Sequence, residues 1–171
     1  VDDEDRENEG DLIIAADAMT PEKMAFMIRH TSGVICAPMS DERADELDLP
    51  LMVAENTESM RTAFTVSVDL VEGTSTGISA SDRSATVVGL SNPERRRAEF
   101  ARPGHIFPLR ARVGGVLKRA GHTEAAVDLC ALADRQPVGV LCEIVNDDGT
   151  MARLSDLEVF AVEHGLQLIT I

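Results

Sequence analysis

Apolar and polar positions along this chain alternate between two periods, one typical of β-strands and one typical of α-helices. Short apolar or alternating runs predict strands at residues 12–16, 33–37, 62–68, 106–111, 138–145 and 166–171. Helical spacing and helix-start signals predict helices that begin near residues 20, 41, 81, 92, 121 and 156. Because strands and helices alternate, we expect a single α/β domain, a layered sandwich in which helices flank a mixed β-sheet.

Individual residues mark where these elements begin and end. Thr20 followed by Pro21 starts one helix, since threonine caps an N-terminus and proline fits the first turn. Gly165 ends the last helix, because glycine readily takes the left-handed conformation of a C-terminal cap. Residues 73–79 predict a loop, and the Pro and Gly within residues 102–105 predict a turn before the next strand.

The chain is acidic, with 30 Asp and Glu against 16 Lys and Arg among 171 residues and a formal net charge of −14. Such a charge disfavours nucleic acid and anionic membrane surfaces as partners. Aromatic side chains on which nucleic-acid bases could stack are few as well, since the chain has five Phe and neither Trp nor Tyr. No apolar run approaches the roughly 18 residues of a membrane-spanning helix. We therefore expect neither a nucleic-acid-binding nor a membrane protein.

Three widely spaced cysteines, Cys36, Cys130 and Cys142, exclude a complete intrachain disulfide framework. We expect reduced thiols and a cytoplasmic location. Cys36 lies in an apolar run, so we expect it to pack in the core and not to act as a nucleophile. The chain starts without Met in an acidic run and stops after a strand-like run, so we expect residues 1–171 to be a domain truncated at both ends.

Residues 2–11 hold seven carboxylates and one arginine. A solvated acidic loop is the simplest interpretation of such a run. The run is followed directly by an apolar strand, however, and it contains Gly10, which suggests an anchored and constrained backbone. Clustered carboxylates without cysteine suit a hard cation such as Mg²⁺ or Mn²⁺.

Three further groups of residues are candidates for ligand binding or catalysis. Arg119, His122 and Thr123 lie at a predicted helix start, where free N–H groups and the helix dipole favour a phosphate. His105 follows Pro and Gly, and it is a candidate general acid or base. Glu143 lies among apolar residues, where a carboxylate needs a partner or a metal. Structural interpretations remain open for His105 and Glu143 at this point.

Together these motifs resemble one enzyme family along the whole chain. The shared motifs are residues 3–11, 77–83, 102–111, 119–125 and 139–152. The chain resembles 3,4-dihydroxy-2-butanone-4-phosphate synthase, a lyase of riboflavin biosynthesis. The resemblance implies conversion of D-ribulose 5-phosphate to 3,4-dihydroxy-2-butanone 4-phosphate and formate. The implied steps are a metal-stabilised enediol, a dehydration, a skeletal rearrangement and the loss of one carbon.

The resemblance also implies roles for single residues. It implies Glu7 and His122 as ligands of Mg²⁺ or Mn²⁺, and His105 and Glu143 as catalytic residues. The implied substrate-binding residues are Arg6, Glu7, Asp11, Thr76, Arg119, Ala120, Gly121, His122, Thr123 and Glu143. It further implies a cytoplasmic homodimer and, in a longer chain, a possible fused GTP cyclohydrolase II domain.

Two alternatives stay open at the level of sequence. The first is another metal-dependent sugar-phosphate enzyme, of the isomerase or aldolase type, which would use the same enediol chemistry. The second is a non-catalytic acidic domain that binds a metal. Formate release separates them, because only the reaction implied by the resemblance produces it.

Overall fold

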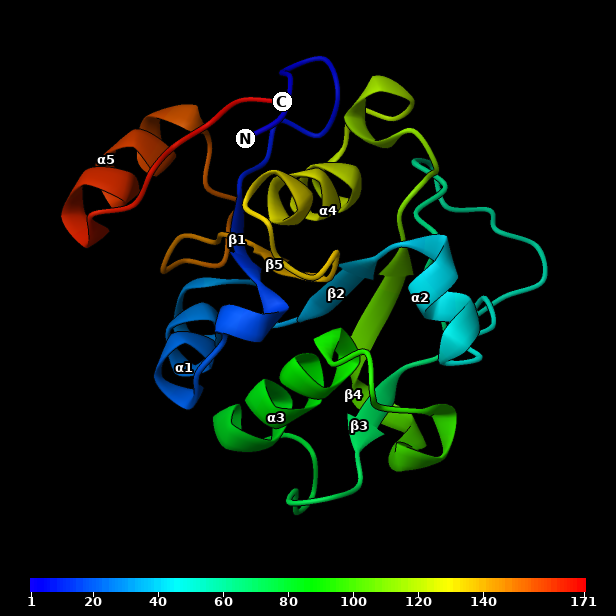
Figure 1. Cartoon of the computed structure of the whole chain (residues 1–171). Helices are drawn as coiled ribbons and strands as arrows, with labels where there is room; N and C mark the ends of the chain where they lie inside the picture. Colours follow the sequence, from blue (N-terminus) through cyan, green and yellow to red (C-terminus); the bar gives the residue numbers. More distant parts are fainter.

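A mixed sheet of five strands forms the centre of the molecule, and helices cover both of its faces (Figure 1). The computed structural model describes all residues, 1–171. The strands are β1 (Asp11–Ala15), β2 (Cys36–Met39), β3 (Val68–Leu70), β4 (Phe100–Arg110) and β5 (Gly139–Glu143). The helices are α1 (Pro21–His30), α2 (Asp41–Glu46), α3 (Ala80–Ser91), α4 (His122–Leu132) and α5 (Leu154–His164). The expected single α/β domain with a mixed, helix-flanked sheet is confirmed.

The strand order is β1-β5-β2-β4-β3, and only the β2–β4 pair is parallel. In this register Asp11 pairs with Glu143 at one end of the β1–β5 ladder. Cys36 of β2 pairs with Leu141 on one side and with Phe107 on the other. These pairings align residues of three strands across the sheet, and they fix which side chains share a face.

The two faces of the sheet are covered unequally. On one face α1, α2 and α3 enclose the main core, which includes Met24, Leu47 and Leu90. On the other face α4 packs on β1, β5 and β2, around a smaller apolar cluster with Leu109 and Leu141. Around His105 of β4, whose side chain is 42% exposed, this second face remains open.

The chain's two ends meet beside α5. Leu157 of α5 packs against Gly10, where a Cβ atom would overlap the leucine side chain. Arg153, the residue before α5, donates hydrogen bonds to the backbone carbonyls of Glu7 and Asn8. Figure 1 shows the two termini side by side, and the Val1 ammonium donates to the Ile169 carbonyl at 2.9 Å.

Several predicted elements are wrong, because tertiary pairing or a local side-chain hydrogen bond decided the structure. Residues 102–105 form no turn, because β4 runs through them with Gly104 packed directly against the backbone of β3. The predicted helix at residue 92 is absent, since the Asn92 side chain accepts the Glu94 N–H and the chain forms only a short 3₁₀ turn at Arg97–Glu99. Residues 166–171 form no strand, since Ile169 and Ile171 bond to the backbone of Val1 and no ladder forms with the edge strand β1.

Other boundaries shift less. Within residues 62–68 only isolated pairings form, and the regular strand starts at Val68. Ser79, and not Ser81, caps α3 by accepting the Asp82 N–H. The Thr20 cap and the Gly165 stop are both present. No helix of the structure has the length and apolar character needed to cross a membrane.

Candidate active site

A cleft of about 180 Å³ lies where the acidic loop meets the start of α4. The lining residues come from six parts of the chain that are distant in sequence. The predicted site residues among them are Arg6, Glu7, Asp11, Arg119, His122, Thr123 and Glu143. The remaining lining residues are Glu9, Cys36, Glu58, Thr62, Phe64, Leu109 and Leu141. The fold therefore gathers most of the predicted residues around one cavity.

The predicted metal ligands, Glu7 and His122, lie together in this cleft. A carboxylate oxygen of Glu7, a ring nitrogen of His122 and a carboxylate oxygen of Asp2 all lie within 4.8 Å of one another. His122 Nδ1 is 3.7 Å from Glu7 Oε2 and 3.7 Å from Asp11 Oδ1. His122 Nε2 and Asp11 Oδ1 are buried and make no hydrogen bond within the protein. Unsatisfied buried donors and acceptors of this kind point to a ligand.

Asp2 shapes the acidic loop around these groups. Its carboxylate accepts hydrogen bonds from the backbone N–H groups of Glu7 and Glu9 and from the Arg6 guanidinium, the last at 2.5 Å. Arg6 also donates to Glu7 at 2.6 Å, which holds the carboxylate beside His122. Sequence reasoning did not single out Asp2 among its acidic neighbours, because only the folded loop distinguishes them.

The protonation of these groups reflects their burial and their neighbours. Burial raises the pKa of Asp11 to about 7, and its side chain is only 3% exposed. The His122 imidazole, followed by the Arg6 guanidinium, lowers the pKa of Glu7. Burial opposes a charge on His122, yet the carboxylates of Glu7, Asp11 and Asp2 raise its pKa. A cation among these carboxylates would offset their negative charge, and oxygen ligands with one imidazole fit Mg²⁺ or Mn²⁺.

A second group of side chains, the basic Arg6 and Arg119, lies at the start of α4. Gly121 caps the helix without a side-chain hydrogen bond, so the first N–H groups of the helix are free. A Cβ atom on Gly121 would lie 2.5 Å from Arg119 Nη1 and 2.7 Å from Arg6 Nη2. The two guanidinium groups therefore flank this glycine, while Ala120 is exposed and lies outside the cleft lining.

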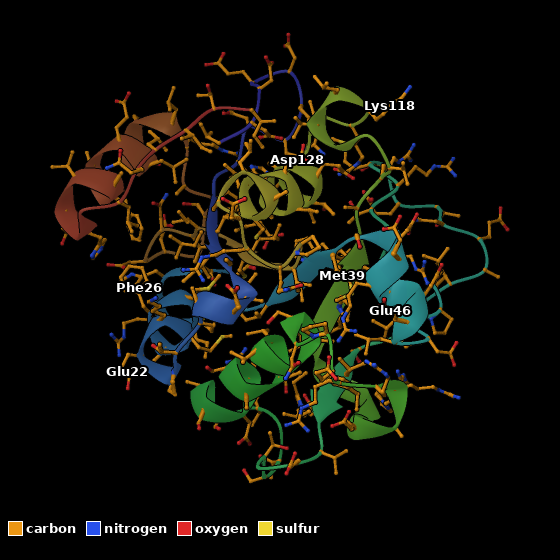
Figure 2. The ribbon with its side chains drawn as sticks, viewed as in Figure 1. Glu22, Phe26, Met39, Glu46, Lys118 and Asp128 are labelled. Carbon is orange, nitrogen blue, oxygen red and sulfur yellow. The ribbon has the colours of Figure 1, made fainter.

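Arg119 is held from both sides. The carboxylate of Glu124, which is 1% exposed, accepts from Arg119 Nη1 at 2.7 Å. Arg119 Nη2 donates to the Thr62 hydroxyl at 3.1 Å. In the segment before Arg119, the Val116 N–H donates to the carboxylate of Asp128 at 2.9 Å. This bond fixes the 3₁₀ turn at Gly115–Leu117 on α4. Figure 2 shows Asp128 on α4 and Lys118 at the outer side of this turn.

Glu143 ends β5 and is half-buried at the edge of the cleft. Its pairing with Asp11 brings the two carboxylates to adjacent strands. Glu143 Oε2 accepts a hydrogen bond from the Ser32 hydroxyl at 2.7 Å. The expected burial is therefore partial, and the carboxylate has the partner that such a position requires.

His105 and Thr76 lie outside the cleft lining. His105 Nδ1 is 2.6 Å from Asp69 Oδ2, and Gly77, next to Thr76, has no room for a Cβ atom beside this pair. His105 lies on β4 and Glu143 on β5, and β2 lies between these two strands in the sheet. Two strand spacings separate them by roughly 10 Å. Within one chain the predicted residues thus form two groups.

Asp69 is a residue that sequence reasoning missed. Its carboxylate accepts both the His105 N–H at 2.8 Å and the His105 ring, and it orients the imidazole. An acidic residue between two apolar strand residues was the available signal, the same signal that identified Glu143. Asp82, from the motif at residues 77–83, accepts hydrogen bonds from Ser75 and Gly77 and shapes the loop that contains Thr76.

Cys36 packs in the smaller apolar cluster, as expected, and its side chain contributes to the floor of the cleft. Burial raises the pKa of the Cys36 thiol far above its ordinary value. The thiol is therefore protonated at neutral pH, which disfavours a nucleophilic role.

Replacement of Asp11 by Asn tests the burial of this carboxyl. Since its pKa rises from an ordinary value of 3.8 to about 7, the folded state binds the proton more tightly than the unfolded state. The ionised Asp11 therefore lowers the free energy of unfolding of the metal-free protein. This loss grows from about pH 4 to pH 7 and stays constant above pH 7, where it reaches up to about 4 kcal/mol. We expect D11N to exceed the wild type in stability above pH 7 and to lose this advantage towards pH 4. Urea unfolding in the presence of chelator measures the stability difference between D11N and the wild type, and D5N, at an exposed position, is the control. A stability difference that does not change with pH would contradict the burial of an ionisable Asp11.

The chain was compared with known families, proteins and structures. The 3,4-dihydroxy-2-butanone 4-phosphate synthase family matches residues 1–171. A relative named 3,4-dihydroxy-2-butanone 4-phosphate synthase from Agrobacterium fabrum is 63% identical over 171 residues, which are all of this chain and 80% of the relative. The riboflavin biosynthesis protein RibBA of Salinispora arenicola is 61% identical over the whole chain, which spans 41% of that protein.

Among solved structures, one described as 3,4-dihydroxy-2-butanone 4-phosphate synthase in complex with two magnesium ions superimposes with a TM-score of 0.97. It is 50% identical, and the match covers 99% of this chain and 84% of that one. The fold, the cleft and these relatives agree with the resemblance seen in the sequence. The chain belongs to the 3,4-dihydroxy-2-butanone 4-phosphate synthase family, whose members are enzymes of riboflavin biosynthesis that convert D-ribulose 5-phosphate to 3,4-dihydroxy-2-butanone 4-phosphate.

Proposed function

We propose that D-ribulose 5-phosphate binds in the cleft between the acidic loop and α4, and that one of its carbons, other than the phosphate-bearing one, leaves as formate. The observation that carries this proposal is the arrangement of two opposite charge environments around one cavity. Glu7, Asp11 and His122 offer ligands for a cation, and Arg119 offers a partner for an anion a few residues away. A sugar phosphate with adjacent oxygens at one end and a phosphate at the other matches both.

The phosphate is placed at the start of α4. Arg6 and Arg119 flank Gly121, and the free N–H groups of the first helical turn face the same corner. The Thr123 hydroxyl lies on the cleft wall and supplies a further donor. The phosphate undergoes no chemistry, so its binding energy serves to hold the reacting carbons in place.

Glu7 and His122 would hold the divalent cation, Mg²⁺ or Mn²⁺. When bound, the cation stabilises negative charge on two adjacent oxygens of the substrate. The unsatisfied Asp11 Oδ1 and His122 Nε2 support a ligand at this place. Arg6 and Asp2 keep the loop folded so that Glu7 remains beside His122.

Proton transfers require groups that differ in basicity. We assign them to Glu143 and Asp11, which pair across the β1–β5 ladder at the cleft, and to His105. Asp69 binds His105 Nδ1, which leaves the other ring nitrogen available to give or take a proton. Closure of the acidic loop over the substrate would exclude water while the enediol exists.

We further propose that the chain forms a homodimer through the open part of the second sheet face. Val34, which precedes β2, is 45% exposed, and the His105 side chain is 42% exposed. A second copy seated there would cover this surface and would bring its own residues to the edge of the cleft. The separation of His105 and Thr76 from the cleft within one chain supports a shared site.

A cytoplasmic location and, in a longer chain, a fused GTP cyclohydrolase II domain complete the proposal. The match of this chain to 41% of a RibBA protein supports the second point.

The first experiment measures formate release from D-ribulose 5-phosphate with Mg²⁺, with chelator, and with Mg²⁺ restored. E7Q and H122A should lose turnover by several orders of magnitude while the circular dichroism spectrum stays unchanged, because each removes a metal ligand. E4Q, an exposed carboxylate of the same acidic run, is the matched control and should keep full activity. Metal-responsive formate release by either ligand variant would overturn the metal assignment.

Replacement of Arg119 by Ala tests the phosphate corner. We expect KM for D-ribulose 5-phosphate to rise by about 10- to 100-fold, the effect of losing one charge-assisted hydrogen bond. R112A removes an exposed arginine from the same loop and should leave KM unchanged. Steady-state kinetics measure both variants, and equal KM values for them would contradict the assignment.

Replacement of Val34 by Asp tests the dimer. A charge at the centre of an apolar contact surface should shift the protein from dimer to monomer in sedimentation velocity, because a buried unpaired charge is costly. V162D introduces the same charge on α5, where Val162 is 84% exposed, and should remain dimeric. A wild-type monomer, or a V34D dimer as tight as the wild type, would rule out this interface.

A further inference from the structure

Ser32 lies in the turn between α1 and β2, beside the end of β5. Its backbone N–H donates to the Glu143 carbonyl at 2.8 Å. Its hydroxyl is 2.7 Å from Glu143 Oε2. One residue thus contacts both the main chain and the carboxylate of Glu143, and neither the family motifs quoted above nor the cleft lining includes it.

The direction of this hydrogen bond follows from the chemistry of the groups. An ionised carboxylate only accepts, so the single hydroxyl proton of Ser32 points to Glu143. The Cys142 sulfur lies 3.2 Å from the same hydroxyl oxygen, and its thiol donates to Glu143 Oε2 at 3.7 Å. Oε2 of Glu143 is therefore occupied, while Oε1 receives no hydrogen bond from the protein, and Glu143 lines the cleft.

The turn that carries Ser32 is fixed on both sides. The Thr31 hydroxyl donates to the Met27 carbonyl at 2.7 Å, which ties the turn to α1. Gly33 has φ +86°, a conformation that favours glycine, and its carbonyl accepts from Arg83 at 3.4 Å. Thr31 also pairs with Ile144 just beyond β5. The Ser32 hydroxyl is thereby held at one place relative to Glu143.

The Ser32 side chain itself is exposed and fills no space in the core. Water would satisfy an exposed hydroxyl, so core packing does not account for its contact with Glu143. We propose that Ser32 is a positioning residue that fixes the Glu143 carboxylate with Oε1 directed to the substrate. This inference rests on the catalytic role proposed for Glu143, through which Ser32 acts.

The test measures kcat and KM for formate release by S32A, S32T and E143Q. S32A removes the hydroxyl without opening a core cavity, so we expect kcat to fall about 10- to 100-fold, as for a lost hydrogen bond to a charged group, with KM nearly unchanged. S32T keeps the hydroxyl and should recover most of kcat. S40A is the matched control, because the Ser40 hydroxyl only caps α2; it should lower the melting temperature and leave kcat unchanged.

The outcomes separate this inference from the function on which it rests. An inactive E143Q together with a slow S32A and an active S32T supports both. An inactive E143Q with an S32A as fast as the wild type overturns the role of Ser32 and leaves that of Glu143 standing. Equally slow S32A and S32T variants overturn it as well, since the hydroxyl would then be irrelevant. A fully active E143Q overturns the proposed role of Glu143 and the inference with it.

Discussion

Asp11 and His122 lie side by side with almost no access to water, and each has a polar atom without a protein partner. An arrangement of this kind opposes folding by several kcal/mol unless other contacts hold it in place. The β1–β5 ladder holds Asp11, the start of α4 holds His122, and the folded acidic loop covers both. The apolar clusters on the two faces supply the free energy that keeps these elements together. The buried polar groups of the cleft therefore lower the stability of the protein, and the packing of the rest of the fold offsets this loss, as is common where a site must receive a ligand.

The two faces of the sheet have different tasks. The face with α1, α2 and α3 is filled with apolar side chains and gives the molecule its main core. The other face carries the ionisable residues, and α4 covers only the part near β1, β5 and β2. One helix thus both closes a small core and directs its N-terminus at the cleft. Because α4 does not pack on the part of β4 around His105, the His105 side chain stays exposed, while its partner Asp69 is buried.

Much of the architecture could be predicted from the sequence, because local signals at Thr20, Gly165 and the apolar runs agree with the tertiary structure. Local signals failed where distant contacts decide. Pro103 and Gly104 are typical of a turn, yet β3 packs so closely on Gly104 that the strand continues through them. The run at residues 166–171 has strand-like composition, but Ile169 and Ile171 bond to the backbone of Val1 and the run forms no ladder with the edge strand β1.

The candidate site shows the same division. Glu7, His122 and Arg119 stand in motifs that combine several chemically unusual residues, and the fold gathers them around one cleft. Asp2, Asp69 and Ser32 carry no such local signal, since a carboxylate in an acidic run or a serine in a turn is ordinary. Only their contacts with Arg6, His105 and Glu143 in the folded chain distinguish them.

The bond from Arg153 to the carbonyls of Glu7 and Asn8 has a consequence for the order in which the protein matures. These partners are separated by up to 146 positions in sequence. During synthesis the acidic loop emerges from the ribosome well before Arg153, the residue that fastens it. The nascent chain therefore carries a dense, unfastened cluster of carboxylates until Arg153 has followed. Divalent ions or basic partners in the cell therefore encounter this cluster as an open polyanion before it becomes an ordered binding site.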